Sequence, residues 1–225
     1  MNINSMLNKI YNTIFPCRCP YCGDIISIDA YACDKCKKNL QQENIITKLI
    51  NSTNVSPFRY DGVYKYAVYN LKFNKCPEYA EQMAVPMVSA INKAFKNQLD
   101  EIGNIDFITY VPTTKKKKYK RGYNQSQLLA KYIAMQLNIK CKPLLIKIKE
   151  NETQHLLPRK KRKSNVKSVF FYNYKFNNLH NKNILLVDDI ITTGATLSEC
   201  TKALYAGGAE NVLCTTYVTV LPENS

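Results

Sequence analysis

The sequence predicts an α/β fold, with a parallel β-sheet flanked by helices and a small cysteine-rich module before it. A strand, a helix and a second strand follow one another between residues 184 and 220. Both strands are continuously apolar, which is typical of a parallel sheet covered on both faces. Five of the nine cysteines fall between Cys17 and Cys36. We therefore expect an N-terminal helix and zinc-binding module in residues 1–45 and the α/β domain in residues 46–225.

The overall composition is that of a folded chain. Of the 225 residues, 45% are hydrophobic and 22% are charged, which argues against global disorder. No run approaches the roughly 20 apolar residues of a transmembrane helix, so we expect no transmembrane segment. Residues 1–16 lack the apolar core of a signal peptide, and their helical spacing predicts an amphipathic helix that packs on the protein, with membrane association as the alternative. Clustered Cys-x-x-Cys pairs within an odd number of cysteines suit a reducing compartment, so we expect a cytoplasmic protein.

Periodicity predicts the elements between the cysteine module and the end of the chain. Residues 52–57 have the composition of a turn, and residues 58–73 are rich in Tyr and Val, which favours strands, such as a hairpin that continues into a helix. Helical spacing predicts helices at 78–97 and 125–137, and short apolar runs predict strands at 105–111 and 144–148. In the last unit we expect a strand at 184–187, a turn at 188–194, a helix at 196–205 and a strand at 211–220.

The positive charge of the chain is regional. The formal net charge is +15, and residues 115–182 hold 19 Lys and Arg against two acids, Glu150 and Glu152. A compositional bias of the genome would spread lysine evenly, whereas here it is clustered. A focused positive field indicates a polyanionic partner, such as a nucleic acid, a phosphorylated ligand or an anionic membrane.

Two Cys-x-x-Cys pairs predict a structural zinc site. Ten residues separate the two pairs, and their four thiolates can complete the tetrahedral coordination of a zinc ion. Such a site has no open position for a substrate, which argues against zinc catalysis. The module has few large apolar residues, so the metal would supply folding energy. Free or redox-active thiols are the alternative, and Cys17 is a spare thiol, although only Cys19 has the two-residue spacing to Cys22. The predicted ligands are Cys19, Cys22, Cys33 and Cys36.

A phosphate-binding loop follows the strand at 184–187. Two adjacent acids, Asp188 and Asp189, stand at its carboxyl end, where ligands bind in open α/β sheets. A run of small and hydroxyl residues then opens a helix, and its backbone N–H groups can approach a phosphate. The two carboxylates suit ribose hydroxyls or a hydrated Mg²⁺. The alternative is a capped helix with turn-forming Asp and Thr, which accounts for one acid and one Thr but not for the whole run.

Residues 184–196 resemble the PRPP-binding motif of type I phosphoribosyltransferases. The resemblance implies a phosphoribosyltransferase-like parallel sheet flanked by helices, with PRPP and Mg²⁺ as ligands. It also implies that Asp188 and Asp189 contact the ribose hydroxyls. The residues that would cradle the 5-phosphate are Thr192, Thr193, Gly194, Ala195 and Thr196.

More of the chain resembles the ComF-family competence proteins (ComFC), which join a four-cysteine zinc finger to a phosphoribosyltransferase domain. The shared motifs include Val111-Pro112, the run Arg121-Gly122-Tyr123-Asn124-Gln125, Thr153-Gln154 and Asn165-Val166, in the order of that family. Tyr123 replaces the commoner Phe, and His155-Leu156 stands where Thr-Gly is usual. The resemblance covers roughly residues 15–220.

Two basic runs, Lys115–Arg121 and Arg159–Lys163, predict a surface that binds the phosphate backbone of DNA. Tyr119 and Tyr123 interleave with the first run and can stack on unpaired bases. A solvated charged loop is one alternative. In the resembling fold the loop after Val111-Pro112 lies near the pyrophosphate of PRPP, which makes Thr113, Lys115 and Arg121 candidates there. The DNA-binding candidates are Lys115, Lys116, Lys117, Lys118, Lys120, Arg121, Tyr123, Arg159, Lys160, Lys161, Arg162 and Lys163.

The family resemblance implies a competence protein that takes up and handles single-stranded DNA during natural transformation and retains a PRPP pocket. Its partners would be single-stranded and also double-stranded DNA, with a helicase or translocase that could hold it at the inner face of the membrane. The alternative is an active phosphoribosyltransferase that transfers phosphoribosyl from PRPP to an unidentified acceptor. No general base or base-selecting residue is evident, so the catalytic residues are unassigned.

Overall fold

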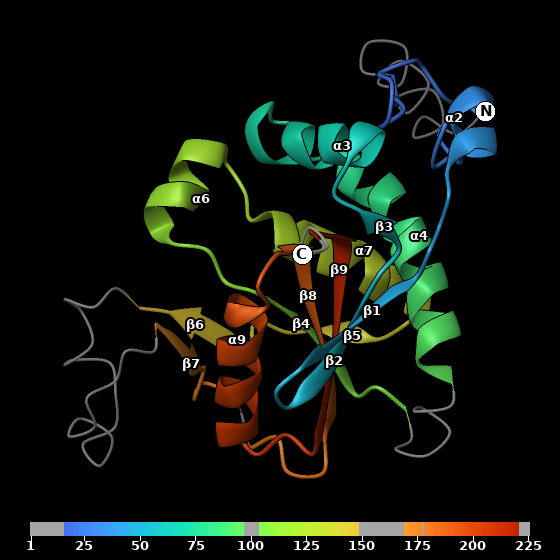
Figure 1. Cartoon of the computed structure of the whole chain (residues 1–225). Helices are drawn as coiled ribbons and strands as arrows, with labels where there is room; N and C mark the ends of the chain where they lie inside the picture. Colours follow the sequence, from blue (N-terminus) through green and yellow to red (C-terminus); the bar gives the residue numbers. More distant parts are fainter. Residues whose placement is uncertain (1–15, 97–103, 149–168, 177, 221–225) are drawn as a thin grey trace, which may run out of the picture.

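A mostly parallel β-sheet forms the centre of the computed structural model, which describes residues 16–96, 104–148, 169–176 and 178–220 (Figure 1). Within this part of the chain the sheet has seven strands in the order β1-β2-β9-β8-β4-β5, with the short β3 also paired to β9. All pairs are parallel except the β1–β2 hairpin. The strands are β1 (Ile45–Leu49), β2 (Ser52–Ser56), β3 (Phe58–Arg59), β4 (Phe107–Tyr110), β5 (Lys140–Cys141), β8 (Asn183–Ile191) and β9 (Asn211–Thr219). This arrangement confirms the predicted α/β class.

Helices cover both faces of this sheet (Figure 1). Leu185 and Val187 of β8 point into a hydrophobic cluster with three helices, whereas Ile184 and Leu186 point into a second cluster on the other face. This alternation explains why residues 184–187 of the strand are all apolar. On the first face lie α3 (Gly62–Phe73), α4 (Tyr79–Ala94) and α7 (Gln125–Leu137). On the second lie α9 (Ala195–Ala206) and a two-stranded antiparallel sheet of β6 (Leu145–Lys147) and β7 (Phe170–Tyr172).

The expectations for residues 52–73 were wrong in part. Residues 52–57 were expected to form a turn, but Ser52–Ser56 is strand β2, which pairs with β9 inside the sheet. Its polar side chains are buried because they bond to each other and to β9: Asn54 Nδ2 lies 3.2 Å from Thr216 Oγ1, and Ser56 Oγ lies 2.6 Å from the same hydroxyl. The Tyr- and Val-rich residues that follow form only the short β3 before helix α3 begins at Gly62.

Two further elements differ from the sequence-based expectation. Strand β8 runs on to Ile191, so Asp188 and Asp189 lie on the strand rather than in the expected turn. Residues Lys115–Arg121, which were expected to be a loop, form helix α6. Thr114 caps this helix by accepting a hydrogen bond from the Lys117 N–H, and Gly122 ends it in the left-handed conformation (φ 88°).

The cysteine-rich segment packs against the α/β domain through Tyr21. This side chain is buried, its ring meets the rings of Phe58 and Tyr64 edge to face, and its hydroxyl accepts a hydrogen bond from Tyr217 at 3.1 Å. Helix α2 (Asp34–Asn39) begins within the second cysteine pair, since Cys33 caps it and Cys36 lies in its first turn. Among the described helices, none is long and apolar enough to cross a membrane.

Candidate functional site

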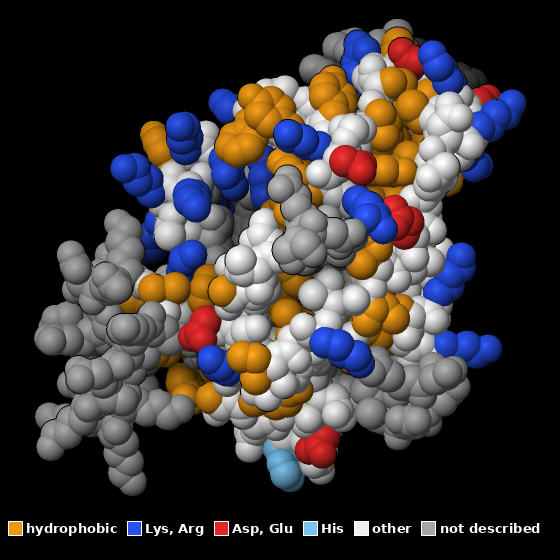
Figure 2. Space-filling model, viewed as in Figure 1, with side chains coloured by type: hydrophobic (Ala, Val, Ile, Leu, Met, Phe, Trp, Pro, Cys, Tyr) orange, Lys and Arg blue, Asp and Glu red, His pale blue; other side chains and the backbone are white. Residues whose placement is uncertain are grey.

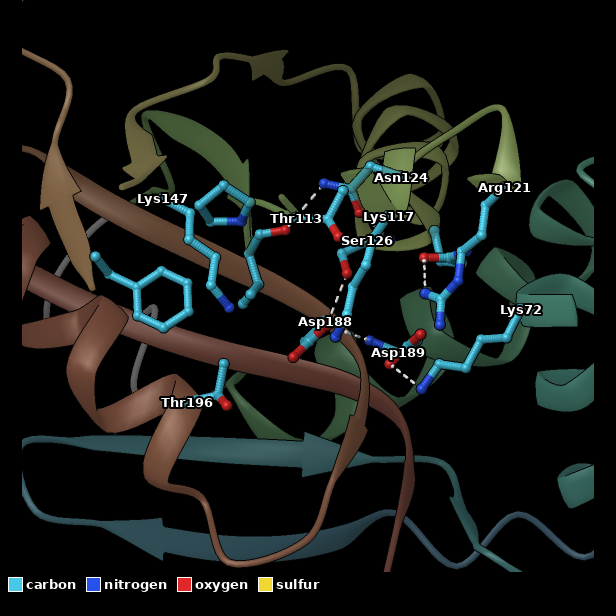
Figure 3. A pocket seen from close by; sticks show the side chains of 14 residues that line it. Lys72, Thr113, Lys117, Arg121, Asn124, Ser126, Lys147, Asp188, Asp189 and Thr196 are labelled. Atoms are coloured by element: carbon cyan, nitrogen blue, oxygen red, sulfur yellow. Dashed lines mark hydrogen bonds and ion pairs between the residues drawn. The ribbon is translucent and has the colours of Figure 1, made fainter. Parts of the chain in front are cut away.

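The candidate site is a cavity of about 180 Å³ at the carboxyl ends of β4 and β8 (Figure 3). Asp188 and Asp189 form its floor at the end of β8, and the N-terminal end of α7 forms one wall. Four cationic side chains from three elements complete the lining: Lys72 of α3, Lys117 and Arg121 of α6, and Lys147 of β6. A cavity therefore lies at the strand end where the sequence predicts a bound ligand.

The two carboxylates have different partners. Asp189 is buried, and its Oδ1 lies 2.9 Å from the Nζ of Lys72, at the end of α3. Asp188 Oδ1 accepts hydrogen bonds from the Ser126 hydroxyl at 2.7 Å and from the Asp189 N–H at 2.9 Å. Burial and the charge of Asp189 raise the pKa of Asp188 to about 7, although the Ser126 hydroxyl, the Asp189 N–H and the charge of Lys72 oppose this rise.

The N-terminal end of α7 positions Ser126. Asn124 caps the helix by accepting a hydrogen bond from the Ser126 N–H at 3.1 Å, and its Nδ2 donates to the Val111 carbonyl at 3.0 Å. These two bonds tie the start of α7 to the end of β4. Arg121 Nη1 donates to Gln125 Oε1 at 3.0 Å, which holds its guanidinium over the same end of the helix. The run 121–125, which the sequence marks as a family motif, thus places both a hydroxyl and a cation.

The loop after β8 forms a second, smaller cavity of about 30 Å³, lined by Asp188 and residues 190–197. Gly194 adopts φ 76° and precedes α9, and a Cβ there would lie 2.6 Å from Leu49 Cδ2. The turn therefore suits glycine for both its backbone conformation and its space. The Thr193 hydroxyl accepts a hydrogen bond from the Ala195 N–H at 3.4 Å. Thr196 lines both cavities, so the loop and the carboxylates border one continuous region.

The remaining predicted site residues divide between the cavity and the surface. Thr113 and Arg121 line the 180 Å³ cavity, whereas Lys115 does not, and Lys117, two residues further along α6, does. Lys115, Lys116, Lys118 and Lys120 are exposed on α6. Tyr123 is turned inward, since its hydroxyl donates to the Leu71 carbonyl at 2.7 Å. The second basic run, Arg159–Lys163, lies outside the described residues.

Sequence reasoning missed Lys72, Ser126 and Lys147. Ser126 had a local signal, because Asn124 two residues earlier has the composition of a helix cap. Lys72 and Lys147 had none, since only the packing of α3 and β6 brings them to the end of β8. Burial and the nearby charge of Lys117 lower the pKa of Lys147, which shows how closely the cations crowd the cavity.

The four cysteines predicted as metal ligands form one cluster. The sulfurs of Cys19, Cys22, Cys33 and Cys36 all lie within 4.8 Å of one another, and Cys22 Sγ is 3.6 Å from Cys33 Sγ. A tetrahedral ion with metal–sulfur bonds of about 2.3 Å requires sulfurs about 3.8 Å apart, so the geometry fits a metal such as zinc. The Cys36 N–H points at Cys33 Sγ at 3.4 Å, as expected for a metal-binding turn. Cys17 is not part of the cluster.

Comparison with known proteins finds one matching family model and several relatives that are named as DNA utilization or competence proteins. The family model of the phosphoribosyl transferase domain matches residues 124–221, which include both carboxylates and the loop. The DNA utilization protein YhgH of Salmonella typhimurium is 29% identical over 86% of this chain and 80% of the relative. Competence protein F of Haemophilus influenzae is 28% identical over 86% and 82%, and competence protein ComFC of Bacillus subtilis is 28% identical over 91% and 76%.

We predict that Asp188→Asn stabilises the ligand-free protein more at pH 8 than at pH 5. The pKa of the folded Asp188 lies above its ordinary value, so ionising it costs stability as the pH rises towards 8. Removing the ionisation should raise the free energy of unfolding at pH 8 by about 1–4 kcal/mol. Urea unfolding at the two pH values measures this. Glu210→Gln, which removes an exposed carboxylate, is the control; an equal effect of Asp188→Asn at both pH values would contradict the prediction.

Proposed function

Since the chain is a homologue of the competence protein F, ComFC and YhgH proteins and carries a phosphoribosyl transferase domain, we propose that it handles single-stranded DNA during natural transformation. In this proposal the strand-end cavity binds PRPP with Mg²⁺, and the basic runs bind DNA. The protein acts in the cytoplasm, where a helicase or translocase of the uptake machinery would hold it near the membrane. In this proposal double-stranded DNA is a second ligand of the same basic surface.

The observation that carries the PRPP proposal is the pair of carboxylates within a group of four cations. PRPP has a ribose diol, a 5-phosphate and a pyrophosphate, and therefore needs hydrogen-bond acceptors beside positive charge. Asp188 and Asp189 supply the acceptors, and the loop at residues 192–196 supplies N–H groups and hydroxyls for the 5-phosphate. Thr113, Lys117 and Arg121 line the same cavity and are the groups proposed for the pyrophosphate.

We expect the carboxylates to be required for PRPP binding. Asp188→Asn and Asp189→Asn remove charged acceptors of nearly the same shape, so each should weaken binding of PRPP with Mg²⁺ by about 10- to 100-fold, in line with about 1.5–3 kcal/mol for a charged hydrogen bond. Isothermal titration calorimetry measures the affinity. Glu210→Gln should bind like the wild type; unchanged affinity in both Asp variants would refute the site.

The surface of α6 carries the DNA proposal. Its sequence contains six cations and no acid, and Figure 2 shows Lys and Arg side chains gathered over it. Such a surface binds phosphates without reading sequence, and salt weakens the binding steeply. The second basic run, Arg159–Lys163, belongs to the same proposal on the strength of its sequence.

We predict that replacing Lys115, Lys116 and Lys118 by Gln weakens binding to a single-stranded oligonucleotide and flattens its salt dependence. Losing three phosphate contacts should reduce the slope of log K against log salt concentration by about 2. PRPP affinity should stay unchanged, because none of the three side chains lines the cavity at Asp188. Fluorescence anisotropy across a salt series measures the slope, with Lys131→Gln on α7 as the control. A slope equal to that of the wild type would exclude α6 from the interface.

The four-cysteine cluster is proposed to hold structural zinc. Four thiolates close the coordination sphere, so the ion would stabilise the fold and leave no position for a substrate. Because Tyr21, between two of the ligands, packs on Phe58 and Tyr64, loss of the metal should destabilise more than the module itself.

We expect Cys33→Ser to lower the zinc content below one ion per chain and to lower the Tm. A loss of about 2 kcal/mol would lower the Tm by roughly 4–8 °C for a chain of this size. Metal analysis and thermal unfolding measure the two effects. Cys76→Ser, which removes a thiol outside the cluster, should change neither. A metal-free wild type with the same Tm would show that the cluster is not a structural metal site.

An active phosphoribosyltransferase is the second candidate, favoured by the complete carboxylate pair and loop. A nitrogen nucleophile of the acceptor would form a bond to C1 of PRPP as the C1–O bond to pyrophosphate breaks. Lys117 and Arg121 would stabilise the charge that develops on the leaving pyrophosphate. Release of pyrophosphate on incubation with candidate acceptors separates this function from binding alone.

A further inference from the structure

Helix α3 exposes a row of aromatic side chains. Tyr66, Tyr69 and Phe73 are 45%, 51% and 56% exposed, and their spacing puts them on one face of the helix, while the opposite face is buried. The rings of Tyr69 and Phe73 lie 5.1 Å apart. Among the described residues, only two other aromatic side chains are as exposed, Tyr119 on α6 and Tyr174. Figure 2 shows hydrophobic side chains gathered over α3, beside the Lys and Arg side chains over α6.

The row ends in a groove of about 240 Å³ between α3 and α6. Its lining consists of one aromatic ring, Phe73, and five cations: Lys72, Lys75, Lys117, Lys120 and Arg121. The Arg121 guanidinium lies 5.2 Å from the centre of the Phe73 ring. Neither helix contains an acidic residue. Rings for stacking and cations for phosphates thus stand next to each other.

We propose that this aromatic row and groove form a stacking platform for unpaired bases of single-stranded DNA. Bases would stack on Tyr66, Tyr69 and Phe73, and Lys75 and Lys120 would contact the phosphates between them. The proposal rests on the proposed DNA function and locates it on α3, a helix whose sequence has no dense basic run. Sequence-tolerant binding is expected, because every base has a face that can stack.

The chemistry of the surface selects this occupant over others. A protein partner or a second copy of the chain would need an acidic surface to match five cations. A free nucleobase would need a ring to stack on but carries no phosphates for Lys75 and Lys120. A polyanion with planar groups at regular intervals matches both features, and single-stranded DNA is such a ligand.

The groove is continuous with the cavity at Asp188, because Lys72, Lys117 and Arg121 line both. A strand bound on α3 therefore passes the mouth of the proposed PRPP cavity. Arg121, stacked on Phe73 and bonded to Gln125, stands between the two ligands.

Removal of the rings tests the proposal. We expect Tyr69→Leu and Phe73→Leu, which keep apolar bulk, each to weaken binding of a fluorescent dT oligonucleotide by about 5- to 150-fold. An abasic oligonucleotide of the same length has the same phosphates, and its affinity should be unchanged in both variants. Phe73→Tyr should retain binding, and Tyr174→Leu, an exposed ring away from α3, is the matched control. PRPP affinity and the Tm confirm that the variants are folded.

The outcomes separate this inference from the function on which it rests. If the wild type binds no oligonucleotide, the proposed DNA function fails. If the wild type binds and the ring variants bind equally well, the platform is refuted while DNA binding stands. If the ring variants change the molecular mass in light scattering without changing DNA affinity, the row is an interface between copies, which also overturns the proposal.

Discussion

Two adjacent carboxylates at the end of the central strand are the constraint on which the rest of the site depends. Asp189 is buried, and the adjacent Asp188 lines the same cavity and accepts a hydrogen bond from the Asp189 N–H. Burying like charges side by side costs free energy unless cations and hydrogen-bond donors surround them. The structure meets this requirement with Lys72 from α3 and Ser126 from the capped end of α7. The pKa of Asp188 is raised, because burial and the charge of Asp189 outweigh these groups, so the compensation is incomplete.

This incomplete balance explains why the cations serve two purposes. Lys72 forms an ion pair with Asp189, and the polyanion proposed for the cavity would bring a phosphate within reach of the same ammonium group. Lys72 and Arg121 also line the groove beside Phe73. An anionic ligand in the cavity or in the groove would therefore change the electrostatic potential at the other site. Linkage between the two proposed ligands would follow from these shared side chains and would need no movement of the fold.

The sequence predicted what contiguous residues encode. The spacing of the cysteines, the strand–loop–helix at 184–196 and the helix at 125–137 are local patterns, and the fold preserves them. Prediction from the sequence failed where contacts between residues far apart in the chain determine the structure. Asn54 and Ser56 have turn composition, yet Thr216 on β9 satisfies them inside the sheet. Lys72 becomes a site residue only when α3 packs beside β8. The helix at 115–121 was overlooked although Thr114 and Gly122 are cap residues, because the dense charge suggested a loop.

The cysteine module is connected to the site through α3. Tyr21 lies between two predicted ligands and contacts Tyr64 in the first turns of α3, where Tyr64 also stacks on Phe58 with ring centres 4.1 Å apart. The same helix ends with Lys72 and Phe73, one in the ion pair with Asp189 and the other in the groove. A metal that held the turn around Tyr21 would therefore help to hold the axis of α3. The position of Lys72 over the carboxylates and the orientation of the aromatic row both follow from that axis, so the module supports the two proposed binding surfaces without touching either ligand.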